Sequence, residues 1–166
     1  MRLYHFTSRR HLRGIAEHGL TVGDVPTDIH RNQGRVGVWL TSAQQPNGHG
    51  LGGATDKTAF RLTLEIADDA PGLFRWTEWA QANVTPLTFE ALKRADGRQD
   101  QTWFVYFGVL PSVSITECFD FYAGKPVTEW PHIPQAPLDL PGVPSWRRAA
   151  WHKSLLKKVA KVAARA

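Results

Sequence analysis

The sequence predicts one α+β domain, because short apolar strands and amphipathic helices follow each other without a regular alternation. Its 166 residues are enough for a single domain with its own core. Apolar residues make up 42% of the chain and aromatic residues 11%, which excludes the composition of a disordered protein. A single cysteine, Cys118, excludes an internal disulfide framework and a multi-cysteine zinc site.

The first predicted unit is a strand that leads into a helix. Residues 3–6 are short and aromatic-rich, as strands are. Ser8 is a residue type that caps helices, and apolar residues then follow at three- and four-residue spacing. Gly19 supplies a left-handed position that ends the helix, and Leu20 can pack back on its last turn.

The middle of the chain alternates between further strands, helices and loops. Apolar runs predict strands, and longer amphipathic stretches predict helices. The predicted strands are residues 36–41, 59–66, 103–107 and 113–119, and the predicted helices are residues 73–83 and 86–95. Residues 21–35 are polar and predict a surface loop. Residues 42–57 form a long glycine-rich loop that lacks the P-loop pattern, so we expect it to be mobile or functional.

The last forty residues differ in composition from the rest. Residues 125–145 hold six prolines, which favour an extended strap across the body or a linker. Residues 146–166 hold seven Lys or Arg and no Asp or Glu, on a predicted helix that Ser145 caps. The predicted organisation is therefore a domain at 1–124, a proline-rich strap or linker at 125–145 and a basic helix at 146–166.

The net charge of +5 comes from this basic helix, since the other 145 residues hold thirteen basic and fifteen acidic groups. Two interpretations stay open for it. The helix can pack on the body with its charges in solvent, or it can bind nucleic-acid phosphates. Trp146 and Trp151 would then stack on bases, or otherwise pack against the strap. Its small apolar face of Ala and Val argues against binding to a membrane surface.

Several segments together resemble a known superfamily. They are residues 3–8 (LYHFTS), 15–20 (IAEHGL) and 37–42 (GVWLTS), joined later by 107–111 (FGVLP) followed by Ile115. In this order they resemble the ADP-ribosyltransferase-like superfamily, which includes DNA-targeting DarT-type toxins and RNA 2′-phosphotransferases. The resemblance implies two packed, mostly antiparallel sheets with flanking helices around an NAD-binding cleft. It covers about a quarter of the chain.

The resemblance also implies roles for individual residues. His5 would hydrogen-bond the nicotinamide-side ribose, and Thr7 would lie beside it in the NAD site. Trp39 occupies the position where a Tyr commonly stacks on nicotinamide, and Thr41 and Ser42 would line the cleft behind it. Each residue also has a purely structural interpretation: a strand histidine bonded to the backbone, a core tryptophan, and polar residues in a turn.

The acid of the family pattern is harder to find. Active transferases carry a Glu at the start of a late strand, where it stabilises developing charge. Residues 98–103 correspond to that stretch, with Gln101 or a neighbour at the Glu position. Asp100 is the nearby acid and becomes the candidate catalytic residue beside His5, although in an extended segment it would face away from Gln99 and Gln101.

These observations leave three functional hypotheses. The first is an NAD-dependent ADP-ribosyltransferase-like enzyme that modifies nucleic acid or protein. The second is a non-catalytic nucleic-acid- or protein-binding module on the same fold, suggested by the missing Glu. The third is the RNA phosphotransferase version, suggested by Arg9, Arg10 and His11. We expect a cytoplasmic protein without a metal site, since no signal peptide, apolar span or metal-ligand spacing is present.

Overall fold

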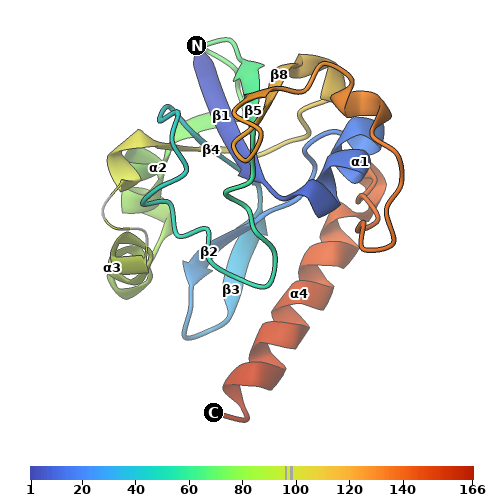
Figure 1. Ribbon diagram of the computed structural model, residues 1–166. Coiled ribbons are helices and arrows are strands. Elements are labelled where there is room, and N and C mark those ends of the chain that lie inside the picture. Colours follow the sequence, from blue (N-terminus) through green and yellow to red (C-terminus); the bar gives the residue numbers. More distant parts are fainter. Residues whose placement is uncertain (96, 98) are drawn as a thin grey trace.

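The computed structural model describes residues 1–95, 97 and 99–166, and it confirms the α+β class (Figure 1). Its main element is a seven-stranded antiparallel sheet in the order β6-β7-β4-β1-β5-β8-β9, and β2 and β3 form a separate two-stranded sheet. The strands are β1 (Arg2–Thr7), β2 (Asp24–Asp28), β3 (Gln33–Val36), β4 (Val38–Thr41), β5 (Phe60–Glu65), β6 (Leu73–Arg75), β7 (Trp103–Tyr106), β8 (Ile115–Asp120) and β9 (Lys125–Pro126).

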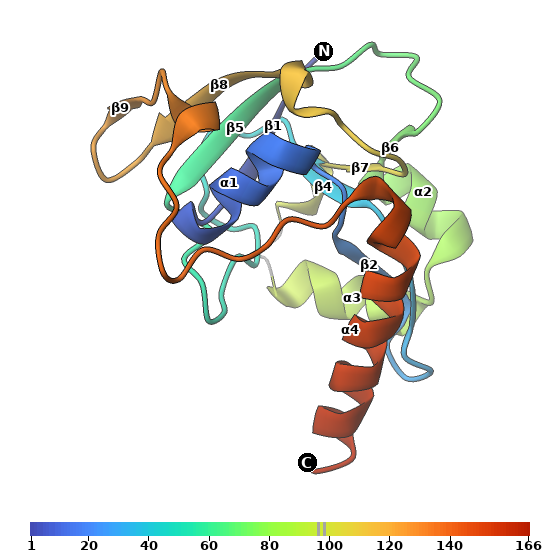
Figure 2. The same cartoon turned by 90° about the vertical axis from the view of Figure 1, so that its right-hand side faces the viewer.

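Helices flank both faces of the large sheet (Figures 1 and 2). The described part of the chain contains four α-helices, namely α1 (Arg9–His18), α2 (Trp76–Asn83), α3 (Pro86–Ala95) and α4 (Arg148–Ala163). Short 3-10 turns precede β7 and α4, at η1 (Asp100–Thr102) and η4 (Ser145–Arg147).

One face of the large sheet packs on α1. In an antiparallel ladder, directly opposed residues share a face, and Leu3 is opposite Leu64 while His5 is opposite Leu62. The alternation predicted for residues 59–66 is confirmed, since Leu62 and Leu64 are fully buried on this side. With Leu12 from α1 they form the larger apolar core.

The opposite face carries an aromatic cluster under α2 and α3. Trp103 and Val105 of β7 are buried there with Trp76 and Trp79 of α2. Trp39 of β4 packs against this cluster and stays half-buried. Four of the seven tryptophans of the chain, Trp39, Trp76, Trp79 and Trp103, are therefore gathered on one side of the sheet.

The predicted strand–helix–glycine unit is confirmed at β1 and α1. Gly19 has a φ of 79° and donates its N–H to the Ile15 carbonyl, so it ends the helix as expected. Leu20 is buried in the α1 core and pairs with Leu110. Ser8 lies at the N-cap position, but its hydroxyl contacts the His11 ring and does not cap the backbone.

The predicted surface loop at residues 21–35 is wrong, because this segment forms the β2–β3 hairpin. Val25 of β2 is fully buried against the aromatic cluster and opposite Arg35 of β3. A single buried residue amid Gly, Pro and Asp gives no alternation in the sequence, so tertiary packing creates this strand. The predicted strand at 36–41 is likewise divided at Gly37 into β3 and β4.

The proline-rich residues 125–145 run across α1 (Figure 2). The Leu140 N–H donates to the Arg10 carbonyl at 2.9 Å, and Thr21 Oγ1 donates to the Val143 carbonyl at 2.6 Å. Arg9 pairs with Asp139 at 3.2 Å. Each of these contacts lies on α1 or just after it, so the segment lies on the body as a strap.

Helix α4 begins at Arg148, two residues later than the sequence predicted, because residues 145–147 form η4. Its first half contacts the body through Arg148, His152 and the Leu156 carbonyl. From residue 157 onward every residue is exposed. The helix therefore projects from the body at its C-terminal end (Figure 1).

Candidate functional site at the β1–β4 junction

Two of the resemblance segments, residues 3–8 and 37–42, lie on neighbouring strands, and the stretch that holds Asp100 leads into the next strand. Tyr4 of β1 is opposite Thr41 of β4, and Thr41 is opposite Trp103 of β7. The strand carrying His5 therefore lies beside the strand carrying Trp39, which lies beside the strand that follows Asp100. Sequence separations of more than thirty residues concealed this adjacency.

His5 lies where β1 and β4 stop pairing regularly. The two strands share a single register position, Tyr4 with Thr41. Beyond it, the Trp39 carbonyl is bonded to His5 Nδ1 at 2.9 Å. In a regular ladder such a carbonyl accepts a backbone N–H of the neighbouring strand. Here an imidazole takes the place of that backbone donor.

The environment keeps His5 neutral and fixes its tautomer. Burial lowers its pKa to about 4, the bond to the Trp39 carbonyl opposes this shift, and the charges of His11 and Lys57 add to it. A carbonyl accepts, so Nδ1 carries the proton and donates. Nε2 then holds a lone pair and has no hydrogen-bond partner among the described residues. The half-buried ring thus presents an acceptor.

A second histidine, His11, and Lys57 lie close enough to His5 for their charges to act on it. Ser8 Oγ and Thr7 Oγ1 lie 3.1 and 3.4 Å from His11 Nδ1. Burial and the charges of Lys57 and Arg10 lower the pKa of His11. Lys57, at the end of the glycine-rich loop, thus acts on both histidines. Thr7, the predicted NAD-site residue, is buried and contacts His11.

Trp39 is held rigidly at the edge of the aromatic cluster. Its Nε1 donates to the Asp24 carbonyl at 2.7 Å. Trp76 and Trp103 approach it edge-to-face, with ring centroids 4.7 and 5.3 Å away. Such contacts fix the indole plane while part of the ring stays accessible. Trp39 therefore packs against a core, and the residue stays half-buried.

Thr41 and Ser42 have structural partners at the end of β4. The Thr41 hydroxyl donates to Thr102 Oγ1 at 2.9 Å and accepts from the Ala43 N–H at 3.0 Å. The Ser42 N–H donates to the Thr102 carbonyl at 2.9 Å, and its side chain is exposed. These bonds tie the start of the glycine-rich loop to the start of β7.

Asp100 lies apart from His5. Strands β1 and β7 run in the same direction, since both are antiparallel to β4. Tyr4 and Trp103 are level with Thr41, so His5 lies one residue beyond this level while Asp100 lies three residues before it. Asp100 is 2% exposed in η1, and its Oδ2 has no hydrogen-bond partner among the described residues. Arg98, in the same stretch, lies outside the described residues.

A second carboxylate on the sheet is engaged elsewhere. Glu117 of β8 pairs with Arg61 at 3.2 Å, and both line a cavity of about 340 Å³. The Arg61 guanidinium lies over the rings of Tyr4 and Phe119, 5.1 and 5.0 Å from their centroids. No hydrogen bond or ion pair joins a carboxylate to His5 within the described part of the chain.

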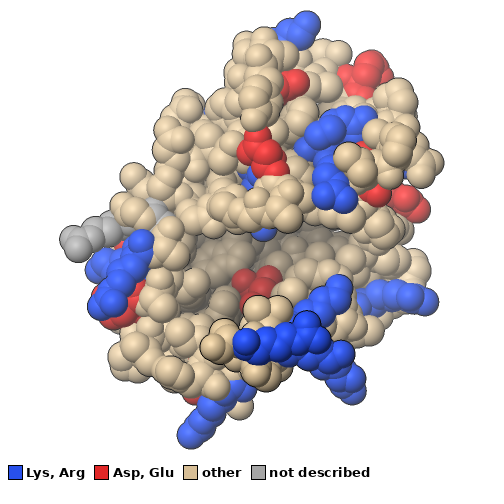
Figure 3. Space-filling model, turned by 60° about the horizontal axis from the view of Figure 1, so that its bottom comes forward, with Lys and Arg blue, Asp and Glu red and all other residues tan. Residues whose placement is uncertain are grey.

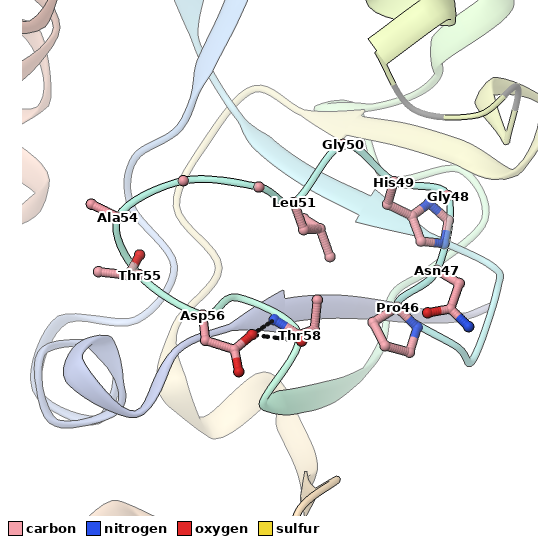
Figure 4. Close-up of a pocket in the computed structure, with 12 residues that line it drawn as sticks. Pro46, Asn47, Gly48, His49, Gly50, Leu51, Ala54, Thr55, Asp56 and Thr58 are labelled. Carbon is pink, nitrogen blue, oxygen red and sulfur yellow. Dashed lines mark hydrogen bonds between the residues drawn. The ribbon is translucent and has the colours of Figure 1, made fainter.

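The glycine-rich loop lines an open pocket of about 610 Å³, formed by residues 46–56 and Thr58 (Figure 4). His49, from this loop, anchors it to the sheet. Its Nδ1 accepts from Trp103 Nε1 at 2.8 Å, its Nε2 donates to the Gln45 carbonyl at 3.1 Å, and its ring stacks on Phe6. Burial lowers the pKa of His49 despite the Gln45 bond. No local pattern in the sequence indicated this role.

The end of the molecule from which α4 projects is hollowed (Figure 3). Lys and Arg side chains stand along parts of the rim of this hollow. Strand β1 runs from the N-terminus toward this end of the molecule (Figure 1). His5 and the polar residues after it therefore lie toward the hollowed end.

Three further properties of the described residues bear on what they can bind or do. They contain no group of three or more His, Cys, Asp or Glu that could hold a metal ion. None of the helices among them is long and apolar enough to cross a membrane. Cys118 is buried, and burial raises the pKa of its thiol to about 12, as expected for a packed core residue.

Comparison with known proteins gives no relative. No protein-family model, no curated protein and no solved structure matches the chain.

Proposed function

We propose that the chain is an ADP-ribosyltransferase-like enzyme that uses NAD as its substrate and modifies nucleic acid or protein. The observation that carries the proposal is the junction of β1 and β4. There the two residues that the resemblance assigns to NAD binding, His5 and Trp39, are joined by a hydrogen bond of 2.9 Å. NAD would supply the ADP-ribose group that is transferred.

His5 has the properties of a ribose-binding residue. Its pKa of about 4 keeps the ring neutral at physiological pH. Because Nδ1 donates to the Trp39 carbonyl, Nε2 can accept a hydrogen bond from a sugar hydroxyl. The backbone bond also fixes the ring plane, so this acceptor is preorganised and loses little conformational freedom on binding.

Trp39 has the properties of a stacking platform. The Asp24 carbonyl and two neighbouring indoles hold its ring, and part of its surface is accessible. A flat ligand such as nicotinamide can pack on a fixed aromatic surface, with the nearby polar groups setting its orientation. The register places the His5 side chain on the α1 face and the Trp39 ring on the aromatic face, so the nicotinamide-ribose end of NAD would have to contact both at the gap where β1 and β4 part.

The catalytic acid fits less well. The resemblance assigns Asp100, a buried carboxylate with an unpartnered oxygen among the described residues. It lies on the far side of the Tyr4–Thr41 level from His5, so transfer through both residues requires movement of η1. This separation favours a second candidate function, a non-catalytic module on this fold that binds nucleic acid or protein.

Calorimetric titration with NAD tests the proposed site. We expect the wild-type protein to bind NAD and His5→Ala to lose binding about tenfold or more, since a preorganised polar partner contributes roughly 1–3 kcal/mol. His30→Ala is the matched control, because His30 is exposed in the β2–β3 turn. Absence of NAD binding to the wild-type protein would contradict the proposal.

Transfer from labelled NAD to DNA, RNA and protein acceptors separates the two candidate functions. The enzyme is expected to label one acceptor class, with loss of label in His5→Ala and in Asp100→Asn. NAD binding without label transfer identifies the binding module. Label transfer that persists in Asp100→Asn would support the transferase and show that Asp100 is not its catalytic acid.

A further inference from the structure

Helix α4 and the turn that follows it carry a line of cations. Lys153, Lys157 and Lys161 of α4 and Arg165, two residues beyond its end, follow each other at four-residue spacing and are called here the α4 row. This spacing places successive side chains on one side of a helix, about 6 Å apart along its axis. All four residues are exposed, and no ion pair or hydrogen bond is formed by their side chains within the described residues.

A different side of α4 holds it to the body. Arg148 Nε donates to the Thr21 carbonyl at 2.7 Å, and His152 Nε2 lies 2.9 Å from Asp24 Oδ1. One turn later, Asn32 Nδ2 donates to the Leu156 carbonyl at 2.6 Å. The α4 row begins one residue after His152 and is therefore turned by about 100° from this contact line. The helix is fixed while its cations face solvent.

Helix stability does not account for the row. Cations are favourable near a helix C-terminus, but this effect is confined to about the last turn. It covers Lys161 and Arg165 and leaves Lys153 and Lys157 unexplained. Like charges four residues apart destabilise a helix, and α4 contains no acidic residue to offset them. Repulsion between these charges therefore destabilises α4, and an anionic partner that binds the row would remove this repulsion.

We propose that the α4 row binds the phosphate backbone of nucleic acid. Each Lys or Arg that neutralises a phosphate releases condensed counterions, which favours binding. The helix lies beside the hollowed face whose rim carries Lys and Arg (Figure 3). Trp146 is 80% exposed at the base of α4 and offers a surface on which an unpaired base can stack.

The inference also selects nucleic acid over protein as the acceptor, and this part rests on the proposed transferase function. Nucleic-acid binding by the α4 row does not rest on that function, because neither His5 nor Trp39 takes part in it. A membrane surface suits α4 less well, since the exposed apolar side chains of its projecting half are Val159 and Val162 among alanines.

Fluorescence anisotropy across a salt series tests the inference without NAD. The probes are a labelled single-stranded DNA oligonucleotide and its duplex. The test variant combines Lys153→Gln, Lys157→Gln and Lys161→Gln, and the control combines Arg13→Gln, Arg94→Gln and Lys125→Gln, three exposed cations elsewhere on the chain. Both variants lose the same charge, and glutamine is a good helix former.

The α4 variant should flatten the slope of log K against log salt by about 2 to 3, from 0.7 to 0.9 per phosphate contact. The control should keep the wild-type slope. Trp146→Ala should weaken binding of the single strand more than that of the duplex if bases stack there. An equal loss in both charge variants, or no binding by the wild-type protein, would overturn the inference. So would binding to phosphatidylserine vesicles but not to oligonucleotides.

The same variants separate this inference from the proposed function. Calorimetry with NAD should give the same result for the α4 variant as for the wild-type protein, since the α4 row lies outside the His5–Trp39 junction. Oligonucleotide binding by a protein that binds no NAD would support the inference and contradict the proposed transferase. NAD binding with no oligonucleotide binding would contradict the inference and support the NAD site of the proposed transferase.

Discussion

The two edges of strand β1 differ sharply. Along β5 it pairs at six consecutive register positions, from Arg2 with Glu65 to Thr7 with Phe60. Along β4 it pairs at one, Tyr4 with Thr41. The β5 edge is thus a closed backbone ladder, whereas the β4 edge is completed by the His5 side chain.

This difference separates backbone pairing from dependence on one side chain along a single strand. A backbone ladder satisfies its polar groups without any particular side chain, so the β5 edge depends on apolar packing such as that of Leu62. The β4 edge depends on the identity of one residue, because another side chain would leave the Trp39 carbonyl without its partner. Substitutions on the two edges should therefore fail in different ways.

Leu62→Ala should have the largest effect on stability. Leu62 is fully buried opposite His5 in the α1 core, and truncation of such a side chain costs about 2–5 kcal/mol. The free energy of unfolding in urea measures this loss. Leu138→Ala, at a position that is 69% exposed, serves as the control and should change little. Equal effects of the two substitutions would show that the β5 edge is not where the fold derives its stability.

Acid should destabilise the protein through the β4 edge. The folded-state pKa of His5 is about 4, below its unfolded value near 6.5, so the unfolded chain binds more protons between these values. Stability is complete above about pH 6.5 and declines as the pH falls toward 4. At about 1.4 kcal/mol per pKa unit, the loss is at most about 3 kcal/mol.

Unfolding in urea at pH 7.5 and pH 5, for the wild-type protein and His5→Gln, measures the contribution of His5. The variant should show a shallower pH dependence, with the remainder due to His11 and His49, whose pKa values are lowered in the same direction by burial. NMR titration of the His5 ring should give a midpoint near pH 4. A midpoint near 6.5 would mean that the ring is solvated.

The sequence predicted an element correctly where the pattern that forms it lies within one short segment. The helix between Ser8 and Gly19 was predicted correctly because its apolar spacing and its glycine terminator lie within one short segment. The hairpin at β2–β3 was missed because only the packing of Val25 makes a strand of that polar segment. Local patterns carry secondary structure where the core does not override them.

The candidate site shows the same division. The resemblance named His5 and Trp39, and the fold brings them into contact. Their linkage through a backbone carbonyl could not be foreseen, because it depends on where two strands part. Nor could the role of His49, which contacts Trp103 across fifty-four residues of sequence. Asp100 was named by position along the chain, and the register places it away from His5.

A smaller effect is expected where the glycine-rich loop meets the sheet. Trp103→Phe keeps an aromatic side chain but removes the five-membered ring with the Nε1–H that His49 accepts, and loss of this hydrogen bond alone should cost about 1–2 kcal/mol. Hydrogen exchange at residues 46–58 should become faster, since His49 no longer ties the loop to β7. Trp146→Phe, at an exposed indole, is the control and should leave exchange unchanged.

The smallest effect is expected from Ser42→Ala at the end of β4, where the resemblance and the hydrogen bonds assign different roles. Ser42→Ala removes an exposed hydroxyl whose contact to the Thr102 carbonyl, at 3.5 Å, is at the limit of a hydrogen bond, so stability should change by less than about 0.5 kcal/mol. Thr41→Val removes two buried hydrogen bonds and should cost about 1–2 kcal/mol. If Thr41 and Ser42 act only in the turn, both variants should bind NAD like the wild-type protein in calorimetry. Weaker NAD binding by a folded Ser42→Ala protein would instead place Ser42 in the NAD site with His5 and Trp39.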